Sequence, residues 1–353
     1  MMVEKNKLIK VGIVGGTGYT GIELIRILSQ HPYVTISVIT SRKEIGEPVS
    51  NLYTNLRGHT SLLFSSLDIN KLLACDVVFF ATPHGIAMNF AKKLIEHNVK
   101  VIDLSADFRF KDPLIFQEYY NIEHSCPELL QISEYGIVEL NRKSIKSANI
   151  IGNPGCYPTT ILLGLAPLFK NPNINLVDLN IIADCKSGIS GSGRKLEINS
   201  LFSEKSENFQ AYGLPKHRHK PEIIANFNHL YKKDIDLIFV PHLVPMIRGM
   251  FSTIYVKLNK DYIDYNFQNL YEKFYKDEHF IDIMPYSSLP DTKSVKASNK
   301  IRISLHKVTN NLLVILVVQD NLVKGAAGQA VQNMNLLFNL PEISGLETVP
   351  IFP

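Results

Sequence analysis

The chain has 353 residues, of which 45% are hydrophobic and 20% are charged, as is typical of soluble globular proteins. This length allows two domains of ordinary size, each with its own hydrophobic core. The formal net charge is only +4 and no basic tract stands out, so nucleic acid is not expected as a partner.

We expect neither a membrane anchor nor a secretory signal. The longest strongly apolar stretch near the C-terminus, Leu312–Val318, is only as long as a strand, and residues 1–10 lack an apolar signal core. The cysteines are widely spaced, with no CxxC pair, which favours a reducing cytoplasm and predicts neither disulfides nor a metal site.

The first 150 residues alternate between strand and helix patterns. The strands and helices expected there are Ile9–Val14, Ile22–Leu28, Val34–Ile39, Val77–Phe80, Ile86–His97 and Val99–Leu104. Strands that alternate with helices of this length form βαβ units, and right-handed crossovers between them give a doubly wound parallel sheet. The sequence therefore predicts an α/β fold, with a Rossmann-type domain over residues 1–152.

Longer β-rich segments follow, with fewer helices between them. They are Leu179–Ala183, Ile238–Val244, Met250–Leu258, Lys300–Val308 and Leu312–Gln319. This pattern is typical of a mixed or antiparallel sheet, so we expect a second, α+β domain over residues 153–320. A last helix, Lys324–Phe338, is expected within a C-terminal segment, 321–353, that packs back on the first domain.

A glycine-rich segment follows the first expected strand and opens a helix. Glycine permits a tight turn and close approach to a pyrophosphate, while the helix N-terminus supplies amide donors, so this context favours a dinucleotide over a purely structural turn. The residues assigned to the cofactor here are Gly15, Thr17, Gly18, Tyr19, Thr20 and Gly21.

The end of the second strand bears on the choice between NAD and NADP. An acidic residue there would accept hydrogen bonds from a ribose hydroxyl, whereas Ser41 and Arg42 suit a 2′-phosphate. We therefore expect NADP(H), the alternative being a solvated basic loop.

Cys156 stands out among the cysteines. It follows Asn153-Pro154-Gly155 and precedes Pro158, a residue suited to a first helical turn. A helix N-terminus stabilises a thiolate, so we expect Cys156 to be a nucleophile, whereas the other three are core or surface thiols.

The chain resembles the N-acetyl-γ-glutamyl-phosphate reductases, relatives of the aspartate-semialdehyde dehydrogenases, over nearly its whole length. The segments that carry the resemblance are GGTGYTG (15–21), TSR (40–42), ATPHG (81–85), DLSADFR (103–109), NPGCYPT (153–159), KSGISGSGRK (186–195), HRHKPEI (217–223), PHLVPMIRGM (241–250) and DNLVKGAAGQA (320–330). One departure is Gly16, where the family usually carries Ala, a change expected to be harmless in a tight turn. The resemblance implies a second domain of the glyceraldehyde-3-phosphate dehydrogenase-like type, used for catalysis and dimerisation.

The resemblance also implies a reductive dephosphorylation of an acyl phosphate through a thioester on Cys156. This chemistry needs a general acid and base. We expect His219 to fill that role with His217 in support, because alternating residues of an extended loop point the same way, and Glu222 could orient one of the imidazoles.

Several further residues are assigned to ligand binding. Arginine forks suit carboxylates and phosphates, and strand ends and glycine-serine loops suit phosphates and ligands in general. The residues expected to bind substrate are Arg194, Lys195, His84 and, as the resemblance implies, Arg109. Those expected to bind the cofactor are Thr82, Pro83, Ser187, Gly188 and, by resemblance, Asn321.

Three alternatives stay open. The chain could be an aspartate-semialdehyde dehydrogenase, a reductase whose lysine-pathway substrate is linked to a carrier protein, or an NADP sensor without catalysis. The expected partners are a small-molecule substrate and other copies of the chain, in a homodimer or homotetramer.

Overall fold

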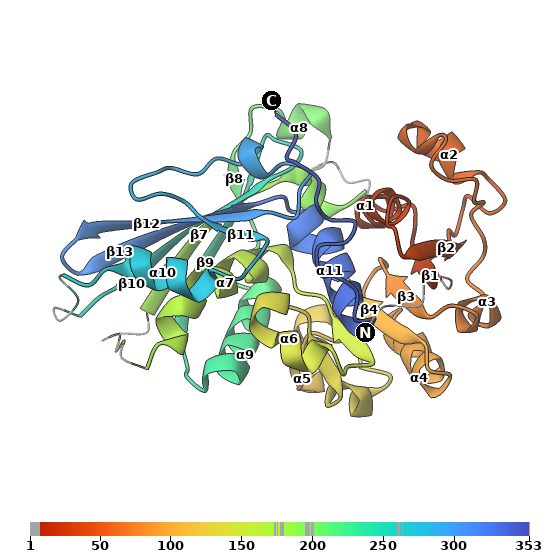
Figure 1. Ribbon diagram of the computed structural model, residues 1–353, viewed down its shortest axis with the longest axis horizontal. Helices are drawn as coiled ribbons and strands as arrows, with labels where there is room; N and C mark the ends of the chain where they lie inside the picture. The colour runs from red at the N-terminus through yellow and green to blue at the C-terminus, as the bar shows by residue number, and fades with distance from the viewer. Residues whose placement is uncertain are drawn as a thin grey trace. The chain divides into compact units, whose positions relative to one another are not determined.

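A computed structural model describes residues 8–352, except 173, 175, 177–179, 195–197, 199–200, 260–261 and 263. The chain divides into two compact units (Figure 1). Unit 1 combines Met1–Pro154 with Ala327–Glu347, and unit 2 combines Gly155–Ala326 with Thr348–Pro353.

Unit 1 is built on a six-stranded sheet in the order β2-β1-β3-β4-β6-β5, and every pair in it is parallel. Its strands are β1 Ile9–Val14, β2 Val34–Ile39, β3 Val77–Phe80, β4 Lys100–Asp103, β5 Ser133–Tyr135 and β6 Ile150–Gly152. Because β1 lies between β2 and β3, the loops that leave these three strands meet at the carboxyl edge of the sheet. In open parallel sheets, this is the edge where ligands bind.

The helices of unit 1 lie between these strands in the chain, except α11, which returns from the C-terminal part of the chain. They are α1 Tyr19–Leu28, α2 Val49–Leu52, α3 Ile69–Leu73, α4 Met88–Glu96, α5 Pro113–Tyr120, α6 Val138–Ile145 and α11 Gly328–Leu337, with short 3₁₀ helices η1 Thr54–Leu56 and η2 Pro127–Leu130. Helix α11 brings polar side chains into the interior. Gln329 Nε2 and Asn333 Nδ2 both donate to the carbonyl of Gly136, at 2.6 and 2.8 Å. These bonds satisfy a buried main-chain acceptor that would otherwise destabilise the unit.

Unit 2 contains a seven-stranded mixed sheet in the order β11-β12-β13-β10-β7-β9-β8. The β7–β9 and β11–β12 pairs are parallel and the other pairs are antiparallel. The strands are β7 Asn180–Gly188, β8 Gln210–Ala211, β9 Asp236–Val244, β10 Met250–Lys257, β11 Ile281–Ile283, β12 Ile301–Thr309 and β13 Leu312–Gln319.

Helices cover one face of this sheet, where α7, α9 and α10 lie side by side in Figure 1. The helices of unit 2 are α7 Cys156–Lys170, α8 Phe202–Lys205, α9 His219–Tyr231 and α10 Phe267–Tyr275, with η3 Ile189–Ser192, η6 Lys293–Val295 and the π-helix η7 Val323–Ala327. On β7 and β9, Ile182 and Ile238 point away from these helices and are 40% and 50% exposed.

The predicted fold class is confirmed, and several predicted strands have the bounds expected, among them β1, β2, β3 and β13. Two local predictions are wrong. The segment from His217 to Glu222 is not an extended loop, because α9 begins at His219 with Pro221 and Glu222 in its first turn, where both residues are favoured. The single helix expected over Lys324–Phe338 is instead a π-helical turn followed by α11.

Candidate active site

The glycine segment of unit 1 forms a tight turn between β1 and α1. Gly15 has a φ of +90°, and a Cβ there would lie 2.4 Å from the carbonyl oxygen of Ala81, so no other residue fits. A Cβ at Gly21 would lie 2.3 Å from the Gly15 carbonyl oxygen. Helix α1 then starts after Gly18, whose backbone is extended and which makes no side-chain cap bond. A helix N-terminus of this kind fits a pyrophosphate.

The rest of this turn faces the loop after β2. The Thr17 carbonyl accepts a hydrogen bond of 2.7 Å from the Tyr53 hydroxyl, and Tyr19 is 40% exposed at the start of α1. Thr20 occupies the next position of that helix. Ser41 Oγ accepts from the amides of residues 43 and 44, which shapes the loop, and Arg42 is exposed beside it.

The loop after β3 carries Thr82, Pro83 and His84. Thr82 lies against the glycine turn, and its buried Oγ1 has no hydrogen-bond partner among the residues that the structure describes. A buried hydroxyl without a partner suits a ligand contact at this position. The His84 ring packs edge-on against Tyr120, with 4.5 Å between ring centroids.

Asp107 fixes the loop after β3 through hydrogen bonds to its main chain. Its carboxylate accepts from the amides of Gly85 and Met88 and from the Ser105 hydroxyl, and it is fully buried. Asp103 lies beside it, and burial, followed by the charge of Asp107, raises the pKa of Asp103 to about 7. Asp107 thus braces the loop that contains three of the predicted binding residues.

Arg109 is nearly buried, at 9% exposed. Its Nε donates to the Asn153 carbonyl at 2.8 Å and its Nη2 to the Leu104 carbonyl at 3.0 Å. A guanidinium carries five N–H donors, and these two bonds fix it against the main chain of unit 1.

In unit 2, Cys156 is the first residue of α7, with Gly155 as the N-cap. Cys156 is partly exposed, whereas Cys75, Cys126 and Cys185 are buried. Burial raises the pKa of Cys75 to about 11 and the pKa values of Cys126 and Cys185 to about 12. The prediction that Cys156 opens a helix is therefore confirmed, and the other thiols are protonated at neutral pH.

The two histidines lie together beside this helix start. The ring centroids of His217 and His219 are 5.0 Å apart, and they lie 5.9 and 5.8 Å from the Tyr157 ring. Burial, followed by the charge of Arg218, lowers the pKa of His217 to about 4, so its ring is neutral at pH 7. Because His217 Nδ1 accepts from the His219 amide at 3.1 Å, the proton of the neutral ring resides on Nε2.

Two buried side chains contact the main chain next to the cysteine. Glu222 Oε1 accepts from the Gly155 amide, and Gln319 Nε2 donates to the Cys156 carbonyl, both at 2.8 Å. Both side chains are 0% exposed. The contact of Glu222 with Gly155 was not expected from the sequence, which suggested only an orienting role for a histidine.

The segment after β7 is more ordered than its composition suggested. Ser187 and Gly188 are the last residues of β7, and η3 follows directly. Asn321 ties this segment to β10, because its Nδ2 donates to Ser190 Oγ at 2.9 Å and its Oδ1 accepts from the Gly249 amide at 2.8 Å. Arg194 is exposed, and Lys195 lies outside the described residues.

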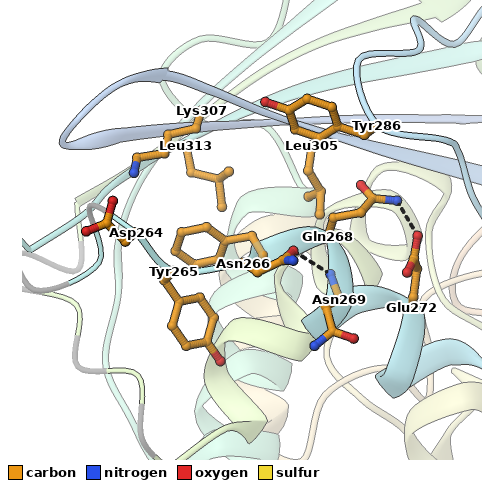
Figure 2. Close-up of a pocket in the computed structure, with 11 residues that line it drawn as sticks. Asp264, Tyr265, Asn266, Gln268, Asn269, Glu272, Tyr286, Leu305, Lys307 and Leu313 are labelled. Carbon is orange, nitrogen blue, oxygen red and sulfur yellow. Dashed lines mark hydrogen bonds between the residues drawn. The ribbon is translucent and has the colours of Figure 1, made fainter.

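A pocket of about 530 Å³ lies elsewhere in unit 2, at the start of α10 (Figure 2). Asn266 caps that helix by accepting from the Asn269 amide, and Gln268 donates to Glu272. None of the residues that line this pocket belongs to the predicted site, so it is not assigned to the catalytic chemistry.

The sequence did not point to Asp107 or Gln319. Asp107 lies within the DLSADFR segment, and that signal alone could have marked it. Gln319 follows an apolar strand and carries no local signal, because its role depends on a contact with a residue 163 positions away.

Comparison with known proteins defines the class. A family model described as "Semialdehyde dehydrogenase, NAD binding domain" matches residues 10–148, and one described as "Semialdehyde dehydrogenase, dimerisation domain" matches residues 156–321. The chain therefore belongs to the semialdehyde dehydrogenase family, whose N-terminal domain binds a nicotinamide cofactor.

Curated relatives narrow the class further. A protein named N-acetyl-gamma-glutamyl-phosphate reductase from Bordetella bronchiseptica is 59% identical over 100% of both chains. A protein of the same name from Herminiimonas arsenicoxydans is 57% identical over 98% of this chain and 100% of its own. The resemblance found in the sequence motifs is thereby confirmed.

Solved structures support the fold. Aspartate semialdehyde dehydrogenase II from Vibrio cholerae, complexed with ASA, has a TM-score of 0.71 at 16% identity, covering 95% of this chain and 99% of its own. An aspartate semialdehyde dehydrogenase with NADP from Candida albicans has a TM-score of 0.68 at 14% identity, covering 94% and 99%. Within the described part of the chain, no helix is both long enough and apolar enough to cross a membrane.

Proposed function

We propose that this chain reduces N-acetyl-γ-glutamyl phosphate to N-acetyl-L-glutamate 5-semialdehyde and inorganic phosphate, with NADPH, in arginine biosynthesis. The observation that carries the proposal is the full-length identity of 59% to a reductase of that name. The position of Cys156 at the start of α7, with the two imidazoles beside Tyr157, supports the chemistry.

The reaction begins at Cys156. Its thiolate attacks the acyl carbon of the substrate, the bond from that carbon to the phosphate oxygen breaks, and phosphate leaves with the bonding electrons. This leaves a thioester on Cys156, so one difficult step is divided into two easier ones. The nicotinamide cofactor, when bound, supplies the hydride that reduces the thioester carbon.

His219 acts as the general acid and base. It donates a proton to the substrate oxygen as the thioester carbon is reduced, and it takes that proton back as the carbon–sulfur bond breaks and the aldehyde is released. His217 stays neutral above pH 4 to 5, because burial lowers its pKa to about 4, so it serves as a hydrogen-bond donor through Nε2. Glu222 holds the Gly155 amide and thereby the start of α7.

The glycine turn, Thr82 and Pro83 hold the dinucleotide, and Ser41 with Arg42 favours NADPH over NADH. We also assign Ser187, Gly188 and Asn321 to cofactor binding, and Arg109, Arg194, Lys195 and His84 to binding of the anionic substrate. The exposed Arg42 suits a 2′-phosphate, because the residues directly after β2 include no acidic side chain that would repel it. We also propose that the chain forms a homodimer or homotetramer, because the family model for residues 156–321 is described as a dimerisation domain.

The test is a reductase assay run in the direction of NADP reduction. Purified protein receives phosphate and N-acetyl-glutamate 5-semialdehyde, with aspartate semialdehyde and NAD as controls. We expect phosphate-dependent turnover with the N-acetylated aldehyde, a preference for NADP, and a loss of at least ~10³-fold in kcat in Cys156→Ser, which lacks the nucleophile.

Other outcomes assign the chain differently. Turnover with aspartate semialdehyde alone would make it an aspartate-semialdehyde dehydrogenase. Tight NADP binding without turnover of either aldehyde would indicate a substrate linked to a carrier protein, or an NADP sensor. Full activity in Cys156→Ser would contradict the covalent mechanism.

A further inference from the structure

Gln319 is the last residue of β13 and reaches the nucleophile segment directly. Its Nε2 donates to the main-chain carbonyl of Cys156 at 2.8 Å, and the side chain is 0% exposed. The Met250 sulfur lies 3.7 Å from the same nitrogen, so the amide is packed on its other side by a side chain of β10. The end of β13 and the start of α7 are therefore joined at the cysteine itself.

Gly325, in the π-helix η7, lies against both Cys156 and Gln319. A Cβ at Gly325 would lie 2.8 Å from the Cβ of Cys156 and 3.0 Å from Gln319 Nε2. The turn that brings Gly325 there is fixed by the bond from its amide to the Asp320 carbonyl, at 3.0 Å. The absence of a side chain at this position lets both Cys156 and Gln319 approach the π-helix.

Packing alone does not explain a glutamine here. Among the described residues, no hydrogen-bond partner reaches Gln319 Oε1, which is buried. A buried carbonyl without a partner destabilises a fold, whereas a methionine of similar length would fill the space without that penalty. Among the described residues, the hydrogen bond of the glutamine goes to the Cys156 carbonyl and its amide nitrogen also lies against the Met250 sulfur, so its polar contact is directed at the nucleophile segment.

We propose that Gln319 is a positioning residue that fixes the first turn of α7 through the Cys156 carbonyl, so that the amides of that turn stabilise the thiolate. A helix N-terminus stabilises a thiolate only within its first turn, where the amide dipoles converge on the sulfur. This inference rests on the proposed function, in which Cys156 is the nucleophile.

The test is the pH dependence of Cys156 alkylation by iodoacetamide in Gln319→Met. We expect the midpoint to rise by about one pH unit, which is a ~10-fold slower reaction near pH 7, with the same plateau rate at high pH. We also expect kcat to fall by a similar factor, the KM for NADPH to stay the same, and the thermal midpoint to stay the same or rise.

Three buried neighbours of Cys156 do not titrate near neutral pH and so do not contribute to the midpoint there. Tyr157, Tyr212 and Cys185 interact electrostatically with Cys156, and burial raises the pKa of each, to about 12 for Cys185. Glu222, on the amide side of the segment, is unchanged in every variant.

A matched control comes from unit 1. Gln329 is also buried, its Nε2 donates to a main-chain carbonyl, and its Oε1 has no partner among the described residues, but its contact is Gly136. Gln329→Met should leave the alkylation midpoint unchanged. A second variant, Gln319→Glu, keeps the shape but places a carboxyl oxygen against the Cys156 carbonyl, and should raise the midpoint further than Gln319→Met.

The outcomes separate this inference from the proposed function. If wild-type Cys156 reacts no faster than a free thiol at pH 7 and Cys156→Ser keeps its activity, the proposed function fails. If wild-type Cys156 is reactive but both Gln319 variants alkylate with the wild-type midpoint, or shift it no more than Gln329→Met, only the role of Gln319 is overturned.

Discussion

The side chains packed around Gly16 leave no room for a larger residue at this position. A Cβ there would lie 2.3 Å from Cγ2 of Ile39 and 3.2 Å from Cε1 of Phe64, and both of these side chains are buried. The family that the chain resembles usually carries Ala at this position, and the sequence suggested that the difference is harmless. The reverse change would not be harmless in this chain, because Ile39 occupies the space that an alanine would need.

Gly16→Ala should therefore destabilise unit 1 by about 1–3 kcal/mol, the usual effect of adding a methyl group to a packed interior. The change is measured by urea denaturation. An unchanged unfolding midpoint in Gly16→Ala would contradict the close contact seen at Ile39.

At the scale of an element, two buried carboxyl groups, Asp103 and Asp107, lie at the end of β4 and just after it, and Asp107 also bonds the loop after β3. Burial, followed by Asp107, raises the pKa of Asp103 to about 7, compared with an ordinary value of 3.8. A carboxyl group whose pKa is raised in the folded state contributes stability that is present below its unfolded pKa. That stability is lost as the pH rises through the folded value.

The free energy of unfolding of the wild type, relative to Asp103→Asn, should therefore fall between about pH 4 and pH 7, by on the order of 4 kcal/mol. Denaturation of both proteins across this range measures the difference. The asparagine cannot ionise, so its own contribution stays constant. A difference that does not vary with pH would mean that the carboxyl pair does not hold a proton.

Elements differ in how far the sequence predicts them. Strands such as β1 and β13 are apolar runs that are followed by glycine or by aspartate and asparagine, so the sequence predicts both their type and their ends. The start of α9 is not predicted, although Pro221 and Glu222 are residues favoured in a first helical turn. Cys156 was readable because its surroundings in the sequence mark a helix start, whereas Asp107 and Gln319 act through neighbours that only the folded chain brings to them.

At the scale of the whole molecule, the uncovered face of the seven-stranded sheet offers a surface for association. Ile182 on β7 pairs with Ile238 on β9 and with Tyr255 on β10, so these side chains form one apolar group. If copies of the chain associate through this face, Ile182→Asp combined with Ile238→Asp should dissociate the oligomer, because burying two unpaired charges is unfavourable. Light scattering during gel filtration measures the mass, with the single exposed substitution Leu114→Asp on α5 as a control. An unchanged mass in the double variant would place the interface elsewhere.

The division of the chain also has a consequence for its synthesis. Unit 1 needs Ala327–Glu347, whose side chains bond the Gly136 carbonyl, yet the ribosome makes all of Gly155–Ala326 before it reaches them. A nascent chain that has just completed β6 still lacks α11, and the Gly136 carbonyl has not yet met Gln329 or Asn333. The unit whose first residues leave the ribosome earliest is thus completed only after nearly all of the other unit has been made.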